Sequence, residues 1–300
     1  MFKLYASYLA SRITEWSLSG RAISSVQKGF MSCEGCYEHN FVLQTTIQTA
    51  RRVRRQCAVA WLNLANTFGS MPHHHIFAML QEFGMPENFL HVIQEPYEGC
   101  STTICSGEGE TAEIQSGVKQ GCALSPIIFN LAMEPLLRAL SKGTDGFNLH
   151  GERVSILAYV DDTEPPRYAR RHQSSCQLGL RFSAKKCATL HIDGSKRDSV
   201  QATGFQIQGK PIIRLAEGQV YQHLSTLTGF RVRQTPKDTI QEILQDAAKI
   251  DTSLLPPWQK INTPEHLLLI LRILFILRGS AVAKVPFNKT EKIDRQLVKK

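Results

Sequence analysis

The chain has 300 residues, which is enough to bury a sizeable core in one large domain or in two smaller ones. Its 42% of hydrophobic and 20% of charged residues exclude an intrinsically disordered protein, and its net charge of +9 favours a polyanionic partner. The strongest apolar run, 267–277, is short and contains Arg272, so we expect a buried helix there and no membrane association.

The first hundred residues are predicted to hold helices around one buried strand. The N-terminus spaces its apolar residues like an amphipathic helix and has no signal-peptide block. Helical patterning reaches residue 56, with breaks at Gly20 and around 29–35. The apolar run 57–64 then predicts a buried strand, because it lies between a basic cluster and a stretch with Asn and Gly. Two further helices are predicted, between Ser70 and Pro86 and over 87–97.

The rest of the chain mixes hairpins with helices. Residues 101–121 hold two strand-like pieces around a Gly-rich turn, and a long helix opens near Ser125. This alternation predicts an α+β fold with helices on one face of a sheet. The later predicted elements are a strand pair over 147–149 and 153–160, no clear element over 163–178, a loop and strand within 178–192, and a helical subdomain from 231.

Two adjacent carboxylates, Asp161 and Asp162, end the strand in ILAYVDDTEPP. Such a pair is costly unless a cation or a tight turn stabilises it. Taken alone, the pair favours a turn, because aspartates at strand ends commonly cap turns. Magnesium sites of phosphoryl-transfer enzymes instead draw carboxylates from separate segments, and the strand 57–64 arrives with Asn63, whose amide oxygen is neutral.

Three other clusters have ordinary interpretations. Cys33 and Cys36 form one CxxC without a second pair at zinc-finger distance, so reduced thiols are favoured over a metal site. The run 73–75 is three histidines at a predicted helix start. The basic cluster either contacts nucleic acid or forms a solvated helix end; its members are Arg51, Arg52, Arg54 and Arg55.

Several segments together carry a family resemblance. They are QKGFMSCEGCYEHNFVLQT, AVAWLNLANTFGSMPHHHIF, SGVKQGCALSPIIFNLAMEPLL, ILAYVDD and GLRFSAKKC, in this order along the chain. The chain resembles the reverse transcriptases of non-LTR retrotransposons, most closely the lineage that inserts into ribosomal RNA genes. The resemblance implies a right-hand polymerase with a palm and incomplete fingers over 1–230 and a helical partial thumb over 231–300. It also implies an intracellular, nuclear protein.

The resemblance assigns the catalytic positions. Asp161 and Asp162 match the paired aspartates that hold two Mg²⁺ ions, and Asn63 stands where the family has its first-strand aspartate. Lys186 matches the lysine that protonates the departing pyrophosphate, a role that suits a cation next to leaving-group charge. These positions imply RNA-directed DNA synthesis on an RNA template and a DNA primer.

The same resemblance assigns nucleotide-binding positions. The carbonyl of Leu64 would face the nucleotide-side metal, and Phe68 would stack under the sugar of the incoming nucleoside triphosphate and exclude a 2′-hydroxyl. Gln120 and Gly121 belong to the loop 117–121, which would line the nucleotide and the template, where glycine allows close backbone approach.

Departures from the family pattern predict an impaired enzyme. Asn63 removes one anionic ligand, and the stretch 163–178 is too short for the expected palm helix. The chain is also expected to lack the first fingers motif, the zinc knuckle and the endonuclease. The alternatives are a catalytically inactive nucleic-acid-binding remnant and a remnant that folds poorly. The oligomeric state stays open.

Overall fold

The structure is a computed structural model in which the chain divides into two compact units. The first unit comprises Met1–Cys33, Gln56–His191 and Gln201–Arg214, and the second comprises Glu34–Arg55, Ile192–Val200 and Leu215–Lys300. The structure describes residues 2–103, 111–143, 145–160, 180–196, 199–232, 234, 237–256, 258–260 and 278, and the backbone of 162–164. None of the helices within these residues is long and apolar enough to cross a bilayer.

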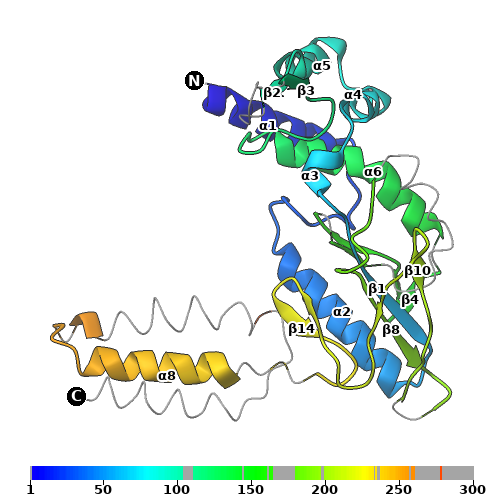
Figure 1. The fold of residues 1–300 in the computed structure, drawn as a ribbon, viewed down its shortest axis with the longest axis vertical. Helices are drawn as coiled ribbons and strands as arrows, with labels where there is room; N and C mark the ends of the chain where they lie inside the picture. The colour runs from blue at the N-terminus through cyan, green and yellow to red at the C-terminus, as the bar shows by residue number, and fades with distance from the viewer. Residues whose placement is uncertain are drawn as a thin grey trace. The chain divides into compact units, whose positions relative to one another are not determined.

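The main sheet is built around strand β1 (Cys57–Asn63) (Figure 1). Over the described residues it has six strands in the order β12–β8–β1–β7–β6, with β9 paired to β8. Five of the seven residues of β1 and all six of β8 are buried, so both faces of these two strands are covered. The strand predicted at 57–64 is thereby confirmed. The other strands are β6 (Leu157–Tyr159), β7 (Asp162–Glu164), β8 (Ala188–Asp193), β9 (Ser199–Val200) and β12 (Ile213–Arg214).

Helix α6 (Ser125–Gly143) is the centre of the helical layer in the first unit. Its N-terminal half is buried on all sides, since Ile128, Phe129, Leu131 and Met133 are fully covered although they point in different directions around the helix. Helices α1 (Phe2–Ser19) and α4 (His73–Glu82) pack against it, and α5 (Glu87–Gln94) packs against α4, as Figure 1 shows. These helices agree with the predicted ones.

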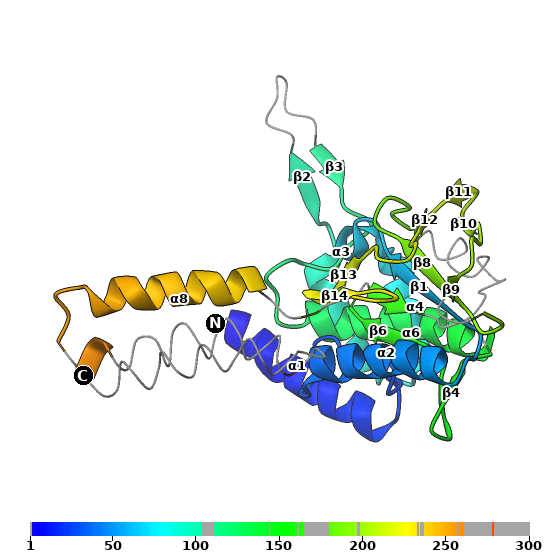
Figure 2. The same ribbon diagram turned by 90° about the horizontal axis from the view of Figure 1, so that it is seen from below.

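Two short hairpins accompany these layers, and one expectation about them was wrong. The run 153–160 is predicted as one strand, but it forms two, because its halves take different partners. Its first half belongs to β5 (Glu152–Val154), which pairs with β4 (Phe147–Leu149), and its second half is β6 in the main sheet. The hairpin of β2 (Ser101–Thr103) and β3 (Thr111–Glu113) is as predicted and projects from its unit in Figure 2.

Strand β7 (Asp162–Glu164) was also missed, because no element is predicted over 163–178. It lies between β1 and β6 and is antiparallel to both. The remainder of the stretch 163–178, where the shortened palm helix is expected, lies outside the described residues.

The second unit packs helix α2 (Gly35–Arg52) against the hairpin of β13 (Tyr221–His223) and β14 (Thr226–Thr228). The Asn40 side-chain amide donates to Thr226 Oγ1 at 3.1 Å. The Arg51 guanidinium lies 4.8 Å from the centre of the Phe230 ring. The unit continues into α8 (Lys237–Asp251), which agrees with the helical patterning expected there.

Candidate active site

Three chain segments meet at Asn63, the last residue of β1. Asn63 is the Cα partner of Asp162, the first residue of β7. Its backbone N–H donates to Cys187 Sγ at 3.3 Å, and its carbonyl accepts a hydrogen bond from the Ser183 N–H at 2.8 Å. The end of β1 therefore lies between the start of β7 and the loop that leads into β8.

The hairpin between β6 and β7 carries the aspartate pair. Tyr159 is paired with Asp162, so only two residues connect the strands. The first of them, Val160, has a φ of 59°, which suits the turn types of two-residue hairpins but is strained for a β-branched residue. Asp161 lies outside the described residues, and Asp162 is described for its backbone alone.

Phe68 lies where β1 leads into the short helix α3 (Thr67–Ser70). Its ring centre is 6.0 Å from that of Phe30 and 4.9 Å from that of Phe129. Its carbonyl accepts a hydrogen bond from the Val118 N–H at 2.8 Å, which ties the loop 117–121 to α3. Gly117 has a φ of 97°, and a Cβ at this position would lie 3.0 Å from the Cα of Gly69. Glycine is thus needed for both the conformation and the close approach.

The remaining predicted positions differ in exposure. Leu64 buries its side chain, and its carbonyl accepts a hydrogen bond from Thr67 Oγ1 at 3.0 Å. Gln120 and Gly121 are exposed on the loop 117–121. Lys186 is exposed in the turn before β8, one residue from the Cys187 thiol that contacts Asn63. Position 162 and the turn carrying Lys186 are therefore close to Asn63, whereas Gln120 and Gly121 lie on the loop that Val118 ties to α3.

Tyr97 supports the loop 117–121, a role that no sequence pattern indicated. The Tyr97 ring meets His73 edge to face at 4.9 Å, and Lys119 Nζ lies 5.6 Å from its centre. Burial raises the pKa of the Tyr97 hydroxyl, and hydrogen bonds with the Lys119 backbone and the Ser125 side chain only partly offset this.

The histidine run has structural partners. His73 Nε2 donates to the Gly117 carbonyl at 2.9 Å, and His75 Nε2 donates to the Ala132 carbonyl at 2.9 Å. These bonds attach α4 to the loop 117–121 and to α6. The interpretation of 73–75 as ordinary helix-start residues agrees with this geometry.

Comparison with known proteins assigns the family. The sequence profile described as "Reverse transcriptase (RNA-dependent DNA polymerase)" matches residues 1–164, more than half of the chain. The chain belongs to the reverse transcriptase family.

Retrotransposon proteins resemble this reverse transcriptase over nearly its whole length. It is 29% identical over 294 residues to the Retrovirus-related Pol polyprotein from type-2 retrotransposable element R2DM of Drosophila melanogaster, covering 91% of this chain and 27% of that protein. It is 25% identical over 296 residues to the type-1 R2 polyprotein of Popillia japonica, covering 91% and 40%. The resemblance to retrotransposon reverse transcriptases is confirmed, and the chain spans less than half the length of these two relatives.

A solved structure agrees with the palm-like fold of the reverse transcriptase. The structure of telomerase from Candida tropicalis in complex with a TWJ fragment of telomeric RNA superimposes with a TM-score of 0.50 at 10% sequence identity. The match covers 97% of this chain and 46% of that chain. At this identity, the likeness concerns the fold alone.

The donor chemistry at the end of β1 suits magnesium in part. Mg²⁺ prefers oxygen ligands, and most of all carboxylates. Position 162 supplies one carboxylate residue directly opposite Asn63, which has only a neutral amide oxygen to offer. Among the described residues no group of three His, Cys, Asp or Glu forms a metal cluster, and the expected ligand side chains of Asp161 and Asp162 are not among them.

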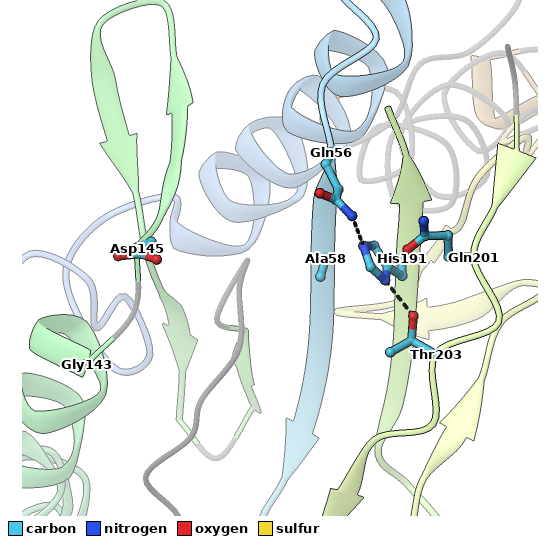
Figure 3. A pocket seen from close by; sticks show the side chains of 7 residues that line it. All are labelled: Gln56, Ala58, Gly143, Asp145, His191, Gln201 and Thr203. Carbon is cyan, nitrogen blue, oxygen red and sulfur yellow. Dashed lines mark hydrogen bonds between the residues drawn. The ribbon is translucent and has the colours of Figure 1, made fainter. Parts of the chain in front are cut away.

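A polar cavity of about 480 Å³ lies at the opposite end of β1 (Figure 3). His191 lines this cavity together with two of its hydrogen-bond partners. Its Nε2 accepts a hydrogen bond from the Gln56 side-chain amide at 3.1 Å, and its Nδ1 donates one to Thr203 Oγ1 at 2.6 Å. The seven residue-to-residue steps from Gln56 to Asn63 span about 23 Å at the usual rise of a strand. This cavity is therefore separate from the candidate active site of the reverse transcriptase.

Proposed function

We propose that the chain is an RNA-directed DNA polymerase domain that copies an RNA template from a DNA primer with deoxynucleoside triphosphates. Residues 1–230 would form the palm and incomplete fingers, and residues 231–300 a partial thumb. The observation that carries the proposal is the meeting of Asn63 with Asp162 and with the loop that bears Lys186, in a chain of the reverse transcriptase family.

The proposed site residues divide the work. Asp161, Asp162 and the Asn63 amide oxygen would hold magnesium, which when bound activates the primer hydroxyl and neutralises triphosphate charge. The Phe68 ring packs against the rings of Phe30 and Phe129, so it offers a rigid platform for the sugar.

Backbone groups and one cation complete the proposed site. The carbonyl of Leu64 and the exposed loop residues Gln120 and Gly121 would contact the nucleotide. Lys186 would deliver a proton to the departing pyrophosphate, and its side chain is exposed.

Asn63 is proposed to impair catalysis. An amide in place of a bridging carboxylate leaves developing charge in the transition state less compensated, which costs several kcal/mol of stabilisation. The test is primer extension on an RNA template with magnesium, comparing the native chain, Asn63→Asp and Asp161→Ala. We expect extension by Asn63→Asp alone. If the native chain extends the primer and Asp161→Ala abolishes that extension, the proposed impairment is refuted. If Asn63→Asp does not extend the primer, the proposal that Asn63 alone limits the polymerase is refuted.

A second function, binding without catalysis, is favoured by the net charge of +9 and by the exposed end of α2. Arg51 stacks on Phe230, whereas Arg52 and Arg54 are exposed. If these two contact phosphates, each replacement by Ala should reduce the dependence of log K on log salt by about 1 for an RNA–DNA duplex. Lys142→Ala, at the exposed end of α6, is the control. If the slope of log K against log salt is the same in the native chain and in both arginine variants, the cluster is a solvated helix end and not a phosphate contact.

A further inference from the structure

Residues 26–31, here called the strap, run beside strand β6. Gln27 forms a parallel bridge with Ala158. The Ala158 N–H donates to the Val26 carbonyl at 3.0 Å, and the Lys28 N–H donates to the Ala158 carbonyl at 2.9 Å. The strap thus adds backbone pairing to β6 just before the hairpin turn.

The Gln27 side chain reaches from the strap to the turn itself. It is 2% exposed. Its Oε1 accepts hydrogen bonds from the Val160 N–H at 3.0 Å and from the Gly29 N–H at 2.8 Å. Its Nε2 donates a longer bond to the Val160 carbonyl at 3.4 Å. One buried amide therefore engages both backbone groups of Val160 and also fixes its own strap.

Val160 is the residue in this hairpin that needs such support. A β-branched residue with a φ of 59° is strained, and this conformation persists only when its surroundings hold it. Tyr159 before it and Asp162 after it are fixed by strand pairing, so the turn cannot relax along the chain. The bonds from Gln27 hold the strained residue itself.

The strap is in turn fastened to α6. The Asn130 side-chain amide, fully buried, donates to the Gly29 carbonyl at 2.9 Å. A Cβ on Gly29 would lie 2.5 Å from the Val160 nitrogen and 2.5 Å from its Cγ2, so the strap passes directly against the turn. The position of Gln27 is therefore set by the core of the unit.

We propose that Gln27 is a positioning residue of the polymerase site. Its side-chain amide holds the strained backbone of Val160, the residue that directly precedes the aspartate pair Asp161 and Asp162 in the chain. This inference rests on the proposed function for its catalytic meaning, but the contact it invokes is testable without activity. If the turn were less rigid, the proposed metal ligands would still be present, but their side chains would no longer be held in the direction that metal binding requires.

The first test is amide hydrogen exchange at Val160 in the native chain. Gln27→Met keeps the length of the side chain and removes its hydrogen bonds, so exchange at Val160 should accelerate about tenfold. Gln27→Glu retains an acceptor for the Val160 N–H and should keep most of the protection. Gln234→Met is the control, because Gln234 is also buried and its amide donates to the Leu227 carbonyl at 2.8 Å in the second unit. Equal exchange at Val160 in the native chain and Gln27→Met would overturn the proposal.

The second test measures synthesis in the Asn63→Asp background. Gln27→Met should lower kcat by about tenfold to a hundredfold with little change in KM for the nucleotide, because ligand direction and not substrate binding is affected. Unchanged kcat despite faster exchange would overturn the positioning role. If Asn63→Asp makes no product, the proposed function fails, while the exchange result still decides whether Gln27 holds the turn.

Discussion

Asn63 and Asp162 are directly opposite each other in the antiparallel pair of β1 and β7. Strand β1 thus ends on a residue with a neutral amide side chain, and its Cα partner on β7 is an aspartate. Directly opposed residues in an antiparallel pair interact through their side chains. The residue at position 63 therefore determines whether one or two carboxylate residues meet at this register.

Asn63→Asp should make the stability of the chain depend on magnesium. Without divalent cations, a second carboxylate at this register should lower the free energy of unfolding by about 0.2–1 kcal/mol. Magnesium should reverse the loss and raise the melting temperature above that of the native chain treated alike. The measurement is thermal unfolding with and without magnesium chloride.

The matched control for that experiment is Asn148→Asp. Asn148 is exposed in the middle of β4, and its Oδ1 accepts from the Gly151 N–H in the turn that follows, so the replacement adds the same charge and keeps the acceptor. A magnesium response of equal size in both variants would mean that the effect is not local to the end of β1.

Gly117→Ala should destabilise the chain more than Gly121→Ala. Both glycines have positive φ, of 97° and 81°, so both replacements introduce backbone strain of about 1 kcal/mol. Only at Gly117 does the added Cβ also meet the Gly69 backbone, at 3.0 Å, whereas nothing lies within 4 Å at Gly121. Urea unfolding measures the difference, and equal losses would show that the loop can move away from α3.

Arg138→Met should expose how much a buried carboxylate depends on its partner. Glu134 is fully buried; it accepts from Arg138 Nε at 2.8 Å and from the Ser24 N–H at 3.0 Å. Removing the guanidinium should lower the free energy of unfolding by about 1.5–3 kcal/mol, because hydrogen bonds to charged groups are strong. Glu134→Gln in the same chain should recover part of the loss.

An exposed ion pair provides the comparison for Arg138. Arg12 and Glu15 form a 3.0 Å pair on the surface of α1, and Arg12→Met should change stability by less than about 1 kcal/mol. Similar losses for Arg12→Met and Arg138→Met would contradict a special role for the buried pair.

Tyr97 should make the first unit sensitive to alkaline pH. Because its pKa is raised in the folded state, the folded chain keeps the proton where the unfolded chain has already lost it. The resulting stabilisation is complete below about pH 10 and is lost as the pH rises through the folded pKa. Tyr97→Phe should flatten this decline in urea unfolding above pH 10. Tyr5→Phe, in an exposed residue, should leave it unchanged; an unchanged decline in Tyr97→Phe would contradict the assignment.

The parts of the fold that the sequence predicted are those with local signals. The strand 57–63 is a continuous apolar run between polar clusters, and α6 begins at a Ser-Pro pair. Strand β7 has no such signal, because its Asp-Thr-Glu sequence is polar and its extended form depends on pairing with β1 and β6. Local sequence therefore could not distinguish β7 from a loop.

The candidate site divides in the same way. The family pattern indicated Asn63, Phe68 and the loop 117–121, which the structure joins through β1 and α3. The sequence around Gln27 shows no periodic pattern of apolar residues that would predict its burial. Its side chain forms hydrogen bonds with a residue 133 positions away in the chain. A contact of that separation is set by the packing of the whole unit and leaves no local pattern.

That separation has a consequence for how the protein acquires its shape. The contact between Gln27 and Val160 closes a loop of more than a hundred residues, which costs conformational entropy. Favourable contacts offset this cost only once β1 and α6, which lie within the loop, have formed. The strained turn at Val160 should accordingly become native late in folding, and it should be among the first parts of the first unit to open when the core loosens.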